Sequence, residues 1–214
     1  MVNEHDDWRP TGEQRIWPNL LTAEGIRGNE EMPDATRNTV LPFVRYLAGA
    51  ADYMICYYDP RIKTTYARQL ALSVVHYSPL QTLYWYDKPE LSHDEPELAF
   101  WDRIPTTWNE TRVLDWRPGQ SMSVARRKGD EWFDGSITNN DARTESLHFD
   151  FLPSGRRYEA TIYAGDPTAP TRTRVGVQTR KIDAATVLTV DPAPSGGQAI
   201  GCVPCPEARR SGCC

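Results

Sequence analysis

The chain has 214 residues, of which 39% are hydrophobic and 25% charged, and its formal net charge at pH 7 is -5. This composition is typical of a folded protein, and the negative charge argues against a nucleic-acid partner, which needs a basic surface. No apolar run reaches the roughly 20 residues of a membrane-spanning helix. The opening residues, MVNEHDDWRP, show neither the basic nor the apolar part of a signal peptide.

Residues 1–105 alternate short apolar runs with helical patterns, which favours α/β structure with parallel strands. The apolar runs MVNEHD and NLLTAEG both end in polar or acidic residues. Further along, the apolar spacing in 64–78 is helical, because its apolar residues recur on one face. The expected helices cover 38–50, with Asn38 as the N-cap, and 64–78, and the expected strands cover 49–59 and 78–89.

From about residue 112 the pattern changes to short alternating runs that are separated by turn residues. In RYEATIYAG, for example, Tyr158, Ala160 and Ile162 fall on one side of a strand. Such alternation predicts an antiparallel β domain with one buried face. We therefore place this domain at 106–200, after a boundary near residue 105.

The end of the chain gathers four cysteines, Cys202, Cys205, Cys213 and Cys214. A structural zinc site usually needs two well-separated pairs of ligands, and two adjacent terminal cysteines make a poor second pair. We therefore expect 201–214 to be a disordered, Cys-rich tail in preference to a zinc-binding module.

Carboxylates cluster near the start of the chain, in NEHDD at 3–7 and in AEGIRGNEE at 23–31. Two carboxylates, one protonated and one ionised, are the minimum set for cleaving a glycosidic bond. Several acids without cysteine partners also suit calcium, which takes oxygen ligands. The alternative is a solvated acidic loop, and spacing alone does not exclude it.

Four longer segments carry a more specific signal: RPTGEQRIWPNLLTAEGIRGNEE, NTVLPFVRYLAGAADYMICYYD, RQLALSVVHYSPLQTLYWYDKPE and PTTWNETRVLDWRPG. From residue 1 to about 200 the chain resembles glycoside hydrolase family 97, which contains calcium-dependent α-glucosidases and α-galactosidases. The resemblance implies a β-sandwich, a (β/α)8 barrel and a small antiparallel β domain. This chain would hold only the C-terminal half of the barrel at 1–105 and a small β-sandwich domain at 106–200.

The same resemblance implies roles for individual residues. Glu30 corresponds to the general acid, and Glu24 and Glu30 correspond to calcium ligands. Asp6 lies where inverting members carry a Glu that serves as general base and calcium ligand. Its shorter side chain favours the retaining, α-galactosidase-like members, whose nucleophile is an Asp on an earlier barrel strand outside this chain. The candidate substrate-binding residues are His5, Arg9 and Trp17.

The expected function is calcium-dependent hydrolysis of α-linked galactosides or glucosides, with an oligosaccharide or α-glycoside as substrate. We expect little activity from the isolated chain, because the nucleophile lies outside it. Full-length relatives are expected to be exported to the periplasm or the extracellular space. The alternative is a catalytically inactive remnant that acts as a carbohydrate-binding or structural module. Sugar specificity and oligomeric state stay open at this point.

Overall fold

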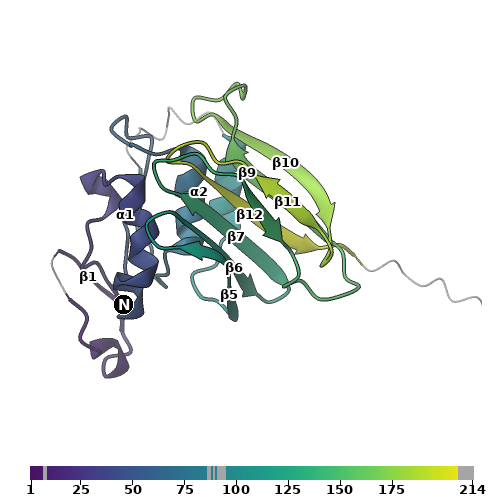
Figure 1. The fold of residues 1–214 in the computed structure, drawn as a ribbon. Coiled ribbons are helices and arrows are strands. Elements are labelled where there is room, and N and C mark those ends of the chain that lie inside the picture. The colour runs from purple at the N-terminus through teal and green to yellow at the C-terminus, as the bar shows by residue number, and fades with distance from the viewer. Residues whose placement is uncertain (7–8, 86–87, 89, 91–94, 207–214) are drawn as a thin grey trace, which may run out of the picture.

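The computed structural model describes residues 1–6, 9–85, 88, 90 and 95–206 (Figure 1). Its first half contains two pairs of parallel strands, β1 with β2 and β3 with β4, with short helices between them. In chain order the elements are β1 (Val2–Glu4), η1 (Glu13–Arg15), β2 (Leu20–Ala23), η2 (Asn29–Glu31), α1 (Ala35–Val40), η3 (Leu41–Phe43), η4 (Arg45–Leu47), β3 (Ile55–Tyr57), α2 (Tyr66–Val75), β4 (Leu83–Trp85), η6 (Pro96–Leu98) and α3 (Ala99–Arg103). Within the described residues, no helix is both long and apolar enough to cross a membrane.

Of the two predicted helices, one is confirmed and the other is much shorter than expected. The helix predicted over 64–78 is α2, whose N-cap Thr65 accepts a hydrogen bond from the backbone N–H of Arg68. The helix predicted over 38–50 stops at Val40, and its N-cap is Asp34 rather than Asn38. Pro42 explains the early end, because proline removes a backbone donor and clashes with the preceding turn. The chain continues instead through the 3-10 turns η3 and η4.

The second half is almost entirely β structure. A six-stranded antiparallel sheet has the strand order β10-β9-β12-β7-β6-β5, and β8 and β11 form a separate antiparallel pair. The strands are β5 (Glu110–Arg117), β6 (Ser121–Lys128), β7 (Glu131–Thr138), β8 (Glu145–His148), β9 (Tyr158–Gly165), β10 (Val175–Ile182), β11 (Val187–Val190) and β12 (Gly197–Pro204). The antiparallel strands that the sequence predicted after residue 112 are therefore confirmed, but the expectation of one buried face is wrong for β6, β7 and β12, which are buried on both faces.

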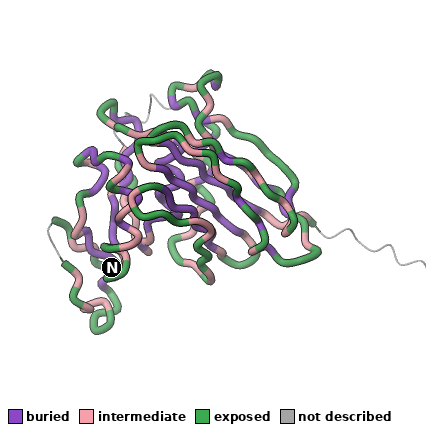
Figure 2. The backbone as a smooth tube through the Cα atoms, in the orientation of Figure 1, coloured by how far each residue is buried: buried purple, intermediate pink, exposed green. Residues whose placement is uncertain are grey.

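Both faces of the six-stranded sheet are covered, so its central strands are buried along most of their length (Figure 2). On one face, Leu70 and Val74 of α2 belong to the same apolar core as Phe133 and Ile137 of β7. The other face packs against the β8–β11 pair, in a separate core. The members of this second core include Leu147, Val190, Trp132 and Ile200. Successive residues of a strand point to opposite faces, which explains why Phe133 and Trp132 serve different cores.

Two glycines allow α2 to lie close to the sheet. A Cβ atom on Gly135 would lie 2.9 Å from the Cβ of Val74, and one on Gly197 would lie 3.0 Å from the Cα of Arg68. Any side chain at these positions would push the helix away from the strands. A helix from the first half of the chain therefore forms part of the core of the β domain.

Arg68 of α2 joins the two halves through hydrogen bonds in the interior. Its side chain is fully buried. Its guanidinium donates to the carbonyl oxygens of Thr138, of Gly196 at 2.9 Å and of Ala35 at 2.9 Å. The oxygen Oδ1 of Asn38 also accepts from it, at 3.3 Å. Burial lowers the pKa of this guanidinium to about 10, so Arg68 is charged at neutral pH.

The Cys-rich tail begins later than predicted. Residues 201–204 belong to β12, and the Cys202 side chain is only 1% exposed. These residues pair with β7 and β9, because β12 is an interior strand of the sheet. The prediction of a tail is therefore wrong for 201–204. Cys213 and Cys214 lie outside the described residues.

Candidate active site

An open cleft of about 690 Å³ lies beside the C-terminal ends of β1 and β2. Because these strands are parallel, the residues that follow them come to the same edge. Asp6 lies two residues beyond β1, and Glu24 follows β2 directly. The described residues that line the cleft are Asp6, Arg9, Glu24, Gly25, Ile26, Arg27, Glu30, Glu31 and Arg37.

Glu24 is held in place from several directions and is only 6% exposed. Its Oε2 accepts a hydrogen bond from the backbone N–H of Asp6 at 2.6 Å. The Nδ1 atom of His5 lies 3.5 Å from the same oxygen. Arg45 Nη2 donates to the carbonyl oxygens of Ala23 at 2.8 Å and of Glu24 at 3.1 Å. These contacts fix both the backbone and the carboxylate of Glu24.

Glu30 lies in η2, and its carboxylate folds back over Gly28. A Cβ on residue 28 would overlap that carboxylate, so a larger residue there would displace the Glu30 side chain. Its Oε2 is buried and has no hydrogen-bond partner among the described residues. Burial, followed by a hydrogen bond and charge repulsion from Glu24, raises the pKa of Glu30 to about 7. A carboxyl group with such a pKa retains its proton in much of the population at neutral pH, as a general acid requires.

The structure brings most of the predicted site residues together. Asp6, Arg9, Glu24 and Glu30 line one cleft, and His5 contacts Glu24. Trp17 is different, because its side chain is 61% exposed and it is not among the described residues that line the cleft. The roles of these residues in catalysis and binding stay predictions.

The carboxylate oxygens in this cleft fit part of a calcium site. Within the described residues, no group of three or more His, Cys, Asp or Glu side chains is arranged to hold a metal ion. Two carboxylates are close enough to interact, because the charge of Glu24 contributes to the raised pKa of Glu30. The unpartnered Glu30 oxygen is the kind of atom that a hard cation binds. Glu24 and Glu30 therefore fit as two ligands, whereas Asp6 contacts Glu24 through its backbone N–H.

Sequence reasoning missed Arg45 as a residue that positions Glu24. It falls in the segment that the sequence predicted as one long helix, where an arginine is expected to face solvent. The 3-10 turns that replace this helix direct Arg45 toward the carbonyl groups at the end of β2. Pro42 is the signal in the sequence for that change of direction, because proline interrupts a helix.

We expect Glu24→Gln to lower the pKa of Glu30 from about 7 toward its ordinary value of 4.5, because it removes one negative neighbour. Burial is the larger cause and persists, so the pKa should stay above 4.5. Carboxyl-carbon NMR titration measures the change. Glu31→Gln is the matched control and should have a smaller effect, because Glu31 contributes least to the shift. An unchanged Glu30 pKa in Glu24→Gln would show that the two carboxyls do not interact.

Comparison with known proteins identifies the family of this chain. Residues 107–202 match the family model described as "Glycosyl-hydrolase 97 C-terminal, oligomerisation". A retaining alpha-galactosidase of Bacteroides thetaiotaomicron is 36% identical over an alignment that covers 76% of this chain. The chain belongs to glycoside hydrolase family 97. It corresponds to the C-terminal portion of the family's proteins. A probable retaining alpha-galactosidase of Streptomyces bingchenggensis is also 36% identical, over 69% of the chain.

Solved structures of family 97 share the fold. A family 97 enzyme from Pseudoalteromonas sp. strain K8, in complex with acarbose, is 32% identical with a TM-score of 0.86. That alignment covers 95% of this chain and 35% of the enzyme. The chain likewise spans only 27% of the Bacteroides relative and 24% of the Streptomyces relative. The similarity to family 97 therefore extends over nearly the whole chain, but over a minor part of each relative.

Proposed function

We propose that this chain contributes the acid half of the active site of a retaining α-galactosidase of family 97. The proposal rests on Glu30, whose carboxyl lies in a cleft beside Glu24 and has a pKa raised to about 7. The choice of α-galactoside over α-glucoside follows the two curated relatives, which are named as retaining or probable retaining alpha-galactosidases. Asp6, in place of a longer Glu, also favours the retaining members.

In this proposal, residues 1–105 form the second half of a (β/α)8 barrel. Two parallel strand pairs with intervening helices support it, as do carboxylates at the C-terminal ends of β1 and β2, where barrel active sites lie. The nucleophile would come from an earlier barrel strand outside these 214 residues.

The proposed chemistry of the chain is proton transfer and substrate positioning. Glu30 donates its proton to the glycosidic oxygen as the bond to the leaving group breaks, and then accepts a proton from water during hydrolysis of the glycosyl-enzyme. Glu24 keeps the Glu30 pKa high enough for the first step, and His5 and Arg45 keep Glu24 in place. Arg9, Arg27 and Arg37 supply donors for sugar hydroxyls in the same cleft.

Glu24 and Glu30 would also hold calcium, as the family resemblance implies. When bound, the ion would supply positive charge that polarises sugar hydroxyls. Other ligands would come from Asp6 or from outside these residues.

The test is hydrolysis of nitrophenyl α-galactoside and α-glucoside by a protein that contains this chain within a complete barrel. We expect the galactoside to react faster and to release α-galactose first, as NMR of the anomeric proton would show. Removing calcium with a chelator should lower the rate, and calcium should restore it. Residues 1–214 alone are the control and should release negligible nitrophenol. β-Galactose as the first product, or a preference for the glucoside, would contradict the proposal.

A further inference from the structure

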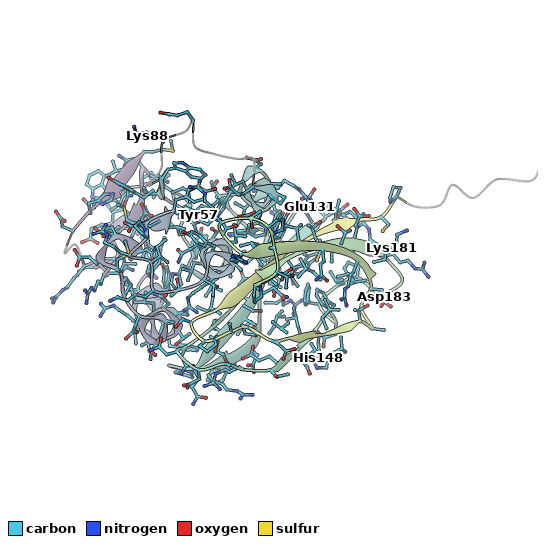
Figure 3. The ribbon with its side chains drawn as sticks, turned by 90° about the horizontal axis from the view of Figure 1, so that it is seen from above. Tyr57, Lys88, Glu131, His148, Lys181 and Asp183 are labelled. Carbon is cyan, nitrogen blue, oxygen red and sulfur yellow. The ribbon has the colours of Figure 1, made fainter. Side chains whose placement is uncertain are left out.

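A second cavity, of about 480 Å³, lies on the β domain between β5–β7 and β8. Its lining is mixed, with acidic, hydroxyl and apolar side chains from both sheets. His148 of β8 lines it and lies well away from Tyr57 of β3 in Figure 3. This cavity is therefore separate from the cleft around Glu30, with which it shares no described lining residue.

A buried polar chain runs along one wall of this cavity. Ser123 and Ser136, which pair across β6 and β7, both line it, and the Ser123 hydroxyl donates to that of Ser136 at 2.9 Å. The Ser136 hydroxyl lies 3.3 Å from Oδ1 of Asp134, which is on the same face of the strand. Asp134 is only 1% exposed, and its Oδ2 has no hydrogen-bond partner among the described residues.

Glu145 of β8 faces this chain from the opposite wall. It lines the cavity, and its buried Oε1 has no hydrogen-bond partner in the described part of the structure. Buried polar atoms in folded proteins are nearly always satisfied by protein, water or ligand. Burial, together with the nearby charge of Glu145, raises the pKa of Asp134 to about 8, so the two acids are close neighbours. The cavity thus presents the two serine hydroxyls and the Glu145 carboxylate, with Asp134 behind the serines and outside the lining.

The rest of the lining favours an organic ligand over a bare cation. Leu114, Leu147 and Phe151 supply an apolar wall, and the volume falls in the usual range for small-molecule pockets. The described residues contain no three-membered group of metal-ligating side chains here or elsewhere. Sugars combine hydroxyls that donate and accept with C–H faces that pack on aromatic rings, which matches both walls.

We propose that this cavity is a second saccharide-binding site, in which Glu145, Ser123 and Ser136 bind sugar hydroxyls and Asp134 holds Ser136 from behind. Binding at this site requires no bond cleavage, and the proposal does not depend on the proposed activity of Glu30. Such a site would hold a glycan on the β domain while the cleft in the first half acts on it.

The experiment titrates residues 1–214 with galactose, glucose and melibiose and follows backbone amide shifts by NMR. We expect saturable shifts on β8, at Ser146 and His148, with at least one sugar. Glu145→Gln should weaken this binding about tenfold or more, the usual effect of losing a hydrogen bond to a charged group. Glu159→Gln is the matched control, because Glu159 is an exposed acid on β9 outside this cavity.

A second variant keeps the test independent of the stability of Glu145→Gln. Ser146 is exposed and lines the cavity, so Ser146→Trp should block it without disturbing the core. Loss of the β8 shifts in Ser146→Trp supports the proposal. An unchanged affinity in both variants, shifts confined to the cleft at Glu30, or no binding of any of the three sugars would overturn it. Saturable β8 shifts with calcium alone, and with no sugar, would reassign the cavity to a cation.

Discussion

In a protein that contains this chain within a complete barrel, Glu30→Gln is expected to lower kcat for melibiose hydrolysis by about 10³-fold, within the range that a general acid supplies. Glutamine is nearly the same size and shape as glutamic acid, but it has no proton to give to the departing glycosidic oxygen. The raised pKa of Glu30, about 7, also predicts the pH dependence. The protonated form prevails below that pKa, so the rate of the acid-assisted step should fall as pH rises through about 7.

A leaving-group comparison separates this role from a general loss of structure. A dinitrophenyl α-galactoside needs little protonation as it departs, so Glu30→Gln should slow its first step far less than it slows melibiose cleavage. Glu31→Gln is the matched control, because Glu31 is the exposed neighbour on the same 3-10 turn and its side chain is 62% exposed. Equal losses on both substrates would argue that Glu30 positions the sugar without donating a proton.

Arg68→Met is expected to lower the free energy of unfolding by about 3–5 kcal/mol, the scale seen when a buried hydrogen-bonded charge is removed. The change removes the donor that the carbonyl oxygens of Thr138, Gly196 and Ala35 share, although the Gly196 oxygen still accepts from the backbone N–H of Thr138 at 3.2 Å. Each unsatisfied buried acceptor is destabilising by about 1–3 kcal/mol. Urea denaturation, followed by circular dichroism, measures the difference.

Arg180→Met provides the matched control for this substitution. Arg180 is exposed on β10, and its hydrogen bond to Gln178 is long, at 3.4 Å. We expect its removal to change stability by less than about 0.5 kcal/mol, as is usual for surface positions. If Arg68→Met proved as mild as Arg180→Met, the interior hydrogen bonds of Arg68 would not be what joins α2 to the sheet.

The sequence pattern predicted the elements that depend on local periodicity. The apolar face of 64–78 became α2, and the alternating runs after 112 became antiparallel strands. It failed where one residue overrides a periodic pattern, as Pro42 does in the segment 38–50. It also failed at β12, because this Cys- and Pro-containing segment forms a strand by pairing with β7 and β9, and that pairing is not visible in the local sequence.

The candidate site also contains both residues that the sequence predicted and residues that it missed. Glu24 and Glu30 were found because strand ends and glycine turns have sequence signatures, and the structure places both in one cleft. Arg45 and Asp134 were not found, because their importance comes from which distant atoms they meet. Arg45 reaches carbonyl groups more than twenty residues away, and Asp134 lies beside Glu145 across two different sheets. Such pairings follow from the tertiary fold and leave no trace in local spacing.

Because α2 packs closely against Gly135 and Gly197, the β domain depends on this helix for part of its core. The family model starts at residue 107, downstream of the helix. A gene fusion that moved only that segment would leave Phe133 and Ile137 facing water, since both pack in the core that α2 completes. Recombination that yields a folding product would have to transfer the helix together with the strands. A fragment that begins at residue 107 is therefore expected to be less stable than one that includes α2.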